Sequence, residues 1–162
     1  MIFLSSEKLR GATSGVARVT ALLARFPPSL AALALRLAVA GPFWRSGLTK
    51  WEGFGRLSDS AVYLFSEEFR LHILGQEIPF PYAQITAFLA GSGEVILPLL
   101  LVLGLGTRLA ALGLLGMTLI VQLTVPDGWR DYHLPWAAML MALLVIGPGR
   151  LSLDSLIARK NG

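Results

Sequence analysis

Three ionisable residues lie inside long apolar stretches of this chain, and they are the first candidates for chemistry. Arg36 and Arg45 interrupt one stretch, and Glu94 lies in the next. A charged side chain within a bilayer costs at least about 2.5–3.5 kcal/mol on insertion scales, so such residues usually have a partner and a function. We therefore treat these three as candidate site residues.

Arg36 and Glu94 are expected to form an intramembrane pair. At 1.5 Å of rise per residue, Arg36 lies about 10 Å and Glu94 about 16 Å from the same membrane boundary. An arginine side chain can bridge that gap. Small residues near both, such as Ala32 and Gly91, favour close approach of the two helices. The pair could form part of a functional site, or it could only fix helix register; the sequence leaves both open.

A second set of polar residues lies nearer the opposite boundary, at similar depth in four apolar stretches. Contributions from four helices predict an outer polar pocket, and the alternative is that the cations snorkel toward water beside amide hydrogen bonds. The set includes one histidine, His133. No metal site is expected there, because no second His or Cys lies within motif spacing of it. The predicted pocket residues are Arg45, Thr49, Lys50, Gln84, Gln122 and His133.

These residues must be positioned by membrane-spanning helices. Four stretches approach the roughly 20 apolar residues that a span needs, at residues 29–51, 82–105, 107–125 and 134–147. Short connections join them, apart from an external loop at 52–81. The pattern predicts an all-α integral membrane protein, a four-helix bundle over residues 29–155.

The flanking segments set the expected orientation. Basic residues are concentrated before the first span, between the second and third, and after the fourth, which places both termini in the cytoplasm. Residues 1–28 form a basic segment whose apolar residues recur at helical spacing, which fits either an interfacial helix or an unstructured tail. Residues 156–162 are a cytoplasmic tail. Within the loop, the amphipathic stretch 58–69 is expected to lie against the outer mouth of the bundle.

Composition supports a membrane protein. The chain has 162 residues, of which 54% are apolar and 15% charged, with a mean hydropathy of +0.64. A soluble domain is nearer 25% charged. The absence of cysteine excludes disulfides, thiol nucleophiles and thiolate-held clusters on this chain. The net charge of +4 comes from residues flanking apolar segments, so no nucleic-acid partner is expected.

Three ordered motifs resemble the DoxX family of bacterial inner-membrane proteins. They begin with LRL and SGLTK at residues 35–50, continue with GE and LGLGTRLAA at 93–111, and end with GPGRLSLD at 147–154. The loop residues YLF at 63–65, with EVILP at 94–98, resemble a subgroup encoded beside oxazolone-modified copper-binding peptides. The family resemblance implies four helices, a multi-pass inner-membrane location, and a role for Arg36, Lys50, Glu94 and Arg108.

The resemblance also frames the functional alternatives. Members are associated with thiosulfate:quinone oxidoreductase and with membrane complexes that handle oxidative stress. The leading hypothesis is a subunit or anchor of a redox or metal-stress system, with soluble or membrane redox partners and possible oligomers. One alternative is a quinone-binding oxidoreductase subunit, in which Arg36 or Arg45 binds a quinone carbonyl and Glu94 relays the proton. Because no flavin, haem or cluster motif is present, a cofactor-bearing partner would have to supply the electrons. A small-molecule transporter is the third.

Overall fold

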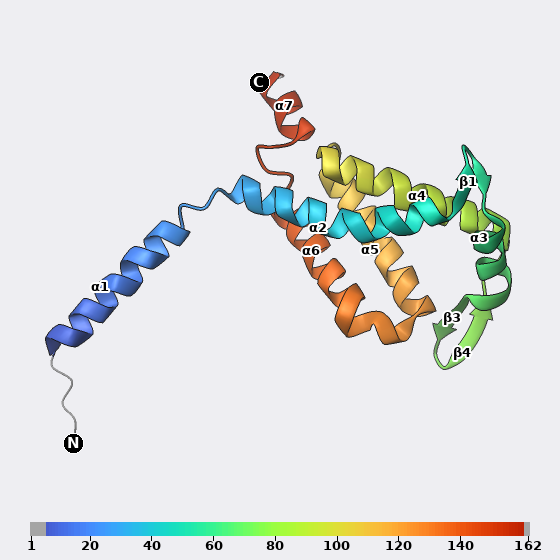
Figure 1. The fold of residues 1–162 in the computed structure, drawn as a ribbon, viewed down its shortest axis with the longest axis horizontal. Coiled ribbons are helices and arrows are strands. Elements are labelled where there is room, and N and C mark those ends of the chain that lie inside the picture. Colours follow the sequence, from blue (N-terminus) through green and yellow to red (C-terminus); the bar gives the residue numbers. More distant parts are fainter. Residues whose placement is uncertain (1–5, 161–162) are drawn as a thin grey trace.

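The structure is a computed structural model that describes residues 6–160, with side chains from residue 15 onward. It is mainly helical (Figure 1). The long helices are α1 (Ser6–Leu23), α2 (Pro28–Thr49), α4 (Ala83–Leu103), α5 (Thr107–Thr124) and α6 (Leu134–Ile146). A short helix, α7 (Leu153–Lys160), follows.

Four helices form the bundle. α2 packs along α4, α4 along α5, α5 along α6, and α6 returns to α2. Their shared core is aliphatic and aromatic, formed by Val39, Ala40, Phe43, Leu101, Ala110, Ala111, Leu114, Leu140 and Leu143. We call the end where α2 begins and α6 finishes the terminal end, and the opposite end the loop end (Figure 1).

Helix boundaries follow ordinary backbone chemistry. Pro28 occupies the first turn of α2, where its missing N–H costs nothing. α4 ends at Gly104, whose positive φ of 68° provides the left-handed cap that a side chain would disfavour. α6 ends at Gly147. The four bundle helices coincide with the predicted stretches to within two residues at every boundary.

Length and composition identify fewer spans than the sequence prediction. α4 and α5 are each long and apolar enough to cross a membrane. A third candidate joins residues Gly15–Leu23 to α2 across a bend of 63°. α6 has 13 residues, fewer than the roughly 20 of an ordinary span. Four crossings and cytoplasmic termini therefore stay predictions.

The loop between α2 and α4 contains more structure than expected. It holds two antiparallel hairpins, β1 (Trp51–Gly53) with β2 (Arg56–Leu57) and β3 (Arg70–Ile73) with β4 (Gln76–Pro79). Between them lie α3 (Asp59–Tyr63) and the π-helix η1 (Leu64–Glu68). The amphipathic stretch 58–69 is helical and packs on α4 through α3 and η1, as predicted.

The remaining segments are short or peripheral. A 3₁₀ turn, η2 (Pro126–Gly128), and a π-helix, η3 (Trp129–His133), connect α5 to α6. α1 is helical, which favours the helical interpretation of the N-terminal segment over an unstructured tail. It extends away from the bundle (Figure 1). Residues 1–5 of that segment and residues 161–162 of the tail lie outside the described residues.

Candidate functional site

A cavity of about 400 Å³ lies at the loop end, between α2, α4, α5 and the loop. Apolar side chains of α4 and α5 form its walls, and Phe65, Phe69 and Phe80 cover it. The ring centroid of Phe65 is 5.2 Å from that of Phe69 and 5.4 Å from that of Phe80. Such a volume suits a small organic ligand, since ligand sites typically measure about 300–1,000 Å³.

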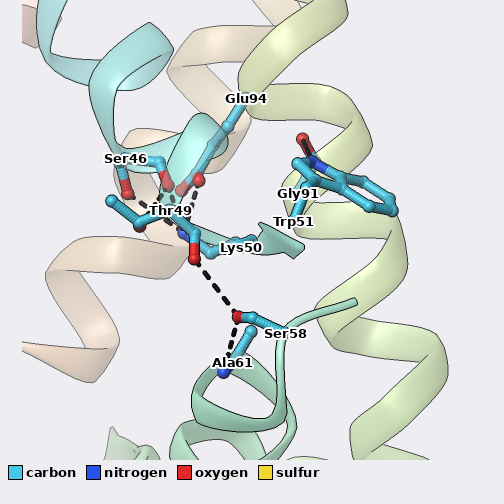
Figure 2. Close-up of polar contacts among 8 residues, drawn as sticks. All are labelled: Ser46, Thr49, Lys50, Trp51, Ser58, Ala61, Gly91 and Glu94. Carbon is cyan, nitrogen blue, oxygen red and sulfur yellow. Dashed lines mark hydrogen bonds and ion pairs between the residues drawn. The ribbon is translucent and has the colours of Figure 1, made fainter. Parts of the chain in front are cut away.

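Lys50 and Glu94 are the charged side chains that line this cavity among the described residues. The Lys50 Nζ donates to Glu94 Oε2, to Ser46 Oγ at 3.0 Å and to the Ser46 carbonyl at 3.4 Å. Only 12% of the lysine side chain and 8% of the glutamate side chain are exposed. Figure 2 shows the pair between the end of α2 and the middle of α4.

One oxygen of Glu94 is left for a ligand. Oε2 receives the lysine hydrogen bond, while no donor among residues 15–160 contacts Oε1. All three N–H groups of the Lys50 ammonium are engaged, so it can donate to a ligand only in place of its longest hydrogen bond, the one to the Ser46 carbonyl at 3.4 Å. Glu94 Oε1 is an acceptor beside the same apolar cavity. The arrangement can bind and orient a small apolar molecule that carries a carbonyl or hydroxyl group.

Two glycines allow α2 and α4 to approach closely enough for the pair. A Cβ at Gly47 would lie 2.9 Å from the Glu94 backbone, so any side chain there would push the helices apart. Gly91 accepts the Trp51 ring, whose Nε1 donates to the Gly91 carbonyl at 3.4 Å. Small residues therefore place Glu94 beside the end of α2.

The loop is fixed to the same place by Ser58. Its Oγ donates to the Thr49 carbonyl at 3.2 Å and accepts from the Ala61 amide at 3.2 Å, which caps α3 (Figure 2). Its amide donates to the Lys50 carbonyl at 2.9 Å. The cap of α3, the helix that precedes η1 and Phe65, is thus hydrogen-bonded to Thr49 and Lys50 at the end of α2.

The predicted Arg36–Glu94 pair is wrong. Arg36 is fully buried at the terminal end, where it donates to the carbonyls of Leu101 (3.4 Å), Val102 (3.3 Å) and Leu151. Helical side chains lean toward the N-terminus of their helix. Because α2 and α4 are antiparallel, the two side chains lean in opposite directions, a fact that a comparison of depths ignores.

The acceptors of Arg36 explain its position. The last carbonyls of a helix lack the donor of a following turn. Leu101 and Val102 lie in the last turn of α4, where the Gly104 cap amide donates to Leu101 at 3.1 Å and Arg36 donates to both carbonyls. Asp154 of α7 binds at the same end of the bundle. Its carboxylate accepts from the amides of Gly106 (2.7 Å) and Thr107 (3.0 Å) at the start of α5. Burial raises the pKa of Asp154, but these amide hydrogen bonds and nearby Arg36 outweigh burial and leave the pKa below its usual value.

The six predicted pocket residues do not form one pocket. Only Lys50 lines the cavity. Thr49 bonds the Ser46 carbonyl of its own helix at 2.8 Å, and Arg45 and Gln84 are exposed. His133 is buried against Gln122, with 2.6 Å between Nδ1 and Oε1, and burial lowers its pKa. Similar depth on four helices did not imply one shared face.

Sequence reasoning also missed residues that matter here. Asp154 was visible only as part of the closing motif, and its contact with α5 depends on the tail folding back. Phe80 gave no signal, because its place above the cavity depends on the β3–β4 hairpin. Arg108 donates to the Leu144 carbonyl at 3.0 Å, so it binds the end of α6 at the terminal end.

Comparison with known proteins gives a consistent result. A DoxX family profile matches residues 31–127, which include all but the first three residues of α2, the loop, α4 and α5. An uncharacterised protein of Haemophilus influenzae is 31% identical over 142 residues, covering 78% of this chain and 83% of the relative. No solved structure matches the chain. The narrower subgroup suggested by residues 63–65 and 94–98 gains no support.

Proposed function

The chain belongs to the DoxX family of membrane proteins, and on that premise we propose that it is a quinone-binding subunit of a redox system in the bacterial inner membrane. The observation that carries the proposal is the Lys50–Glu94 pair at the edge of an otherwise apolar, aromatic-covered cavity. A quinone head has an apolar ring that suits the cavity walls and a carbonyl oxygen that can accept from Lys50, and its reduced form, the quinol, has a hydroxyl that can donate to Glu94 Oε1.

The roles of the two residues follow from their chemistry. The Lys50 ammonium donates to one quinone carbonyl in place of its hydrogen bond to the Ser46 carbonyl, and the Glu94 carboxylate relays protons taken up from water to the ligand through its second oxygen. Reduction of a quinone to a quinol consumes two electrons and two protons. The electrons are assigned to a partner protein that carries a flavin, a haem or an iron–sulfur cluster, so this chain contributes the binding site.

Binding by the purified protein in detergent tests the proposal. We would titrate decylubiquinone and measure its dissociation constant by calorimetry for the wild type, Lys50→Met and Glu94→Gln. Hydrogen bonds to charged groups contribute about 1.5–3 kcal/mol. Lys50→Met should therefore bind decylubiquinone, and Glu94→Gln should bind decylubiquinol titrated in the same way, about tenfold more weakly or worse. No saturable binding by the wild type would reject the proposal.

The chain supplies a matched control. Glu52 and Arg56 form an exposed ion pair at 3.6 Å, and neither lines the cavity. Glu52→Gln and Arg56→Met remove the same kinds of charge and should leave the dissociation constant unchanged. If the control variants weaken binding as much as Lys50→Met and Glu94→Gln, the ligand is responding to net charge and the cavity assignment fails.

A further inference from the structure

We propose that the cavity opens sideways into the bilayer between α4 and α5, and that its ligand carries an apolar chain that leaves through this opening. The inference rests on the proposed function and narrows its ligand class. The ligand is a lipid-dissolved molecule with a polar ring at Lys50 and Glu94 and an uncharged hydrocarbon chain. Water-soluble ring compounds without a chain would fill only the inner part of the site.

The opening is marked by residues that face both ways. Leu89 of α4 and Ile120 of α5 line the cavity, yet their exposed fractions are 64% and 49%. Residues that contact the interior of a cavity and also the outside form its rim. We call Leu89 and Ile120 the portal pair.

The portal pair belongs to the two helices that are each long and apolar enough to cross a membrane. Leu89 lies six residues after Ala83, and Ile120 four residues before Thr124. At 1.5 Å per residue, these positions are about 9 Å and 6 Å inside the helix ends. If the helix ends mark the hydrocarbon boundary, the portal pair faces acyl chains.

The same two helices close again toward the terminal end. A Cβ on Gly113 of α5 would lie 2.9 Å from Leu97 of α4, and a Cβ on Gly93 of α4 would lie 3.1 Å from the sulfur of Met117. Side chains therefore fill the space between α4 and α5 on the terminal side of the cavity. Because contact is tight at these glycines, the gap at Leu89 and Ile120 is local to the loop end.

The other sides of the cavity are less suited to an apolar chain. On the α2 side the exposed lining residue is Ser46, which is polar and accepts from Lys50, and the adjacent Gly47 packs so closely on the Glu94 backbone that a Cβ would not fit. At the loop end, Phe65 packs edge-to-face on Phe69 and at a tilt on Phe80, and all three rings line the cavity. A chain attached to a ring at the ion pair thus has its clearest path between α4 and α5.

The test compares two quinones with one ring. Decylubiquinone carries a ten-carbon chain, and 2,3-dimethoxy-5-methyl-1,4-benzoquinone carries none. Dissociation constants are measured for the wild type, Leu89→Trp and Ile120→Trp in the same detergent, so that partition of the chain into micelles cancels between variants. The controls are Ile96→Trp and Leu119→Trp, which alter exposed residues of α4 and α5 that do not line the cavity.

We expect both portal variants to weaken decylubiquinone binding about tenfold and to change binding of the chain-free quinone less than about twofold. Both control variants should bind both quinones normally. If the portal variants weaken binding of the two quinones equally, the proposed opening is wrong, because the added side chain would then be obstructing the ring. No loss of either quinone would overturn the proposed opening as well.

The two proposals fail separately. If the wild type binds neither quinone, the proposed function fails and the portal fails with it. If both quinones bind in a manner that depends on Lys50, but the portal variants bind like the wild type, the proposed function stands and the portal is wrong. Each variant is first checked for an unchanged helical spectrum and melting temperature.

Discussion

Arg36 at the terminal end and Lys50 at the loop end are both withdrawn from solvent, but their partners differ in kind. Arg36 is surrounded by main-chain carbonyls from α4 and the segment before α7. Lys50 meets the carboxyl group of Glu94, whose second oxygen has no hydrogen-bond donor among residues 15–160. The terminal-end contacts join segments of the chain together, whereas the loop-end contacts leave bonding capacity toward a cavity.

The difference teaches how to separate a structural charge from a functional one. Both cations lie on the same helix and both were candidates by type. A charge whose neighbours are backbone atoms at helix ends contributes to stability, and one that borders an apolar chamber is available to a ligand. The following four changes test that separation, beginning with the largest expected effect.

Arg36→Met should be the most damaging substitution at either end. It removes the side-chain donor from the carbonyls of Leu101, Val102 and Leu151 in a buried region, so we expect the free energy of unfolding to fall by about 3 kcal/mol. Thermal unfolding in detergent measures the loss, and Arg36→Lys should recover part of it. Quinone binding by the folded fraction should stay normal, and selective loss of binding would place Arg36 in the site instead.

Gly47→Ala should separate α2 from α4 beside the ion pair. The added Cβ would lie 2.9 Å from the Glu94 backbone, and overpacking of this kind costs about 2 kcal/mol. Gly41→Ala is the matched control on the same helix, because a Cβ there meets nothing within 4 Å. The control should be neutral or slightly stabilising in a melting experiment. Equal behaviour of the two variants would show that the close crossing is not present.

Double-mutant cycles compare the two cations directly. Glu94→Gln combined with Lys50→Met should show a coupling of about 1.5 kcal/mol, since the residues share a hydrogen bond, and Glu94→Gln combined with Arg36→Met should be additive within about 0.5 kcal/mol. Melting curves of the single and double variants supply both values. Strong coupling of Glu94 to Arg36 would restore the pair that the sequence suggested.

Asp154→Ala should have the smallest effect, and the effect should depend on pH. The carboxylate accepts two amides at the start of α5, a role comparable to a helix cap, which is worth about 1 kcal/mol. Its folded-state pKa lies below the usual 3.8. The contribution is therefore complete above about pH 4 and is lost as pH falls through the folded-state pKa. Melting temperatures of wild type and variant should converge in acid.

The helices were predictable from the sequence because apolar runs end at strong signals. Pro28, Gly104 and Gly147 mark boundaries that local chemistry sets. The hairpins were not predictable in the same way. The β3–β4 turn places Leu74 at a φ of 51° before Gly75, a position where the usual signal is asparagine or aspartate.

The site was predictable in its residues but not in its pairings. Lys50 and Glu94 were both singled out, yet each was assigned other neighbours, because depth along a helix says nothing about the direction of a side chain. The cavity depends on the π-helix that carries Phe65 and on the strand that precedes Phe80. Both arise from tertiary packing of a loop, which no periodicity in residues 52–81 reveals.

The Arg36 contacts also order events during synthesis. Its acceptors belong to residues 101, 102 and 151, so the guanidinium emerges from the ribosome 65 residues or more before its first final partner exists. Until then the first bundle helix carries an unsatisfied charge, which favours a shallow or interfacial position. The last acceptor, Leu151, is translated 115 residues after Arg36. Final burial of the first bundle helix therefore waits until the segment after α6 has been made.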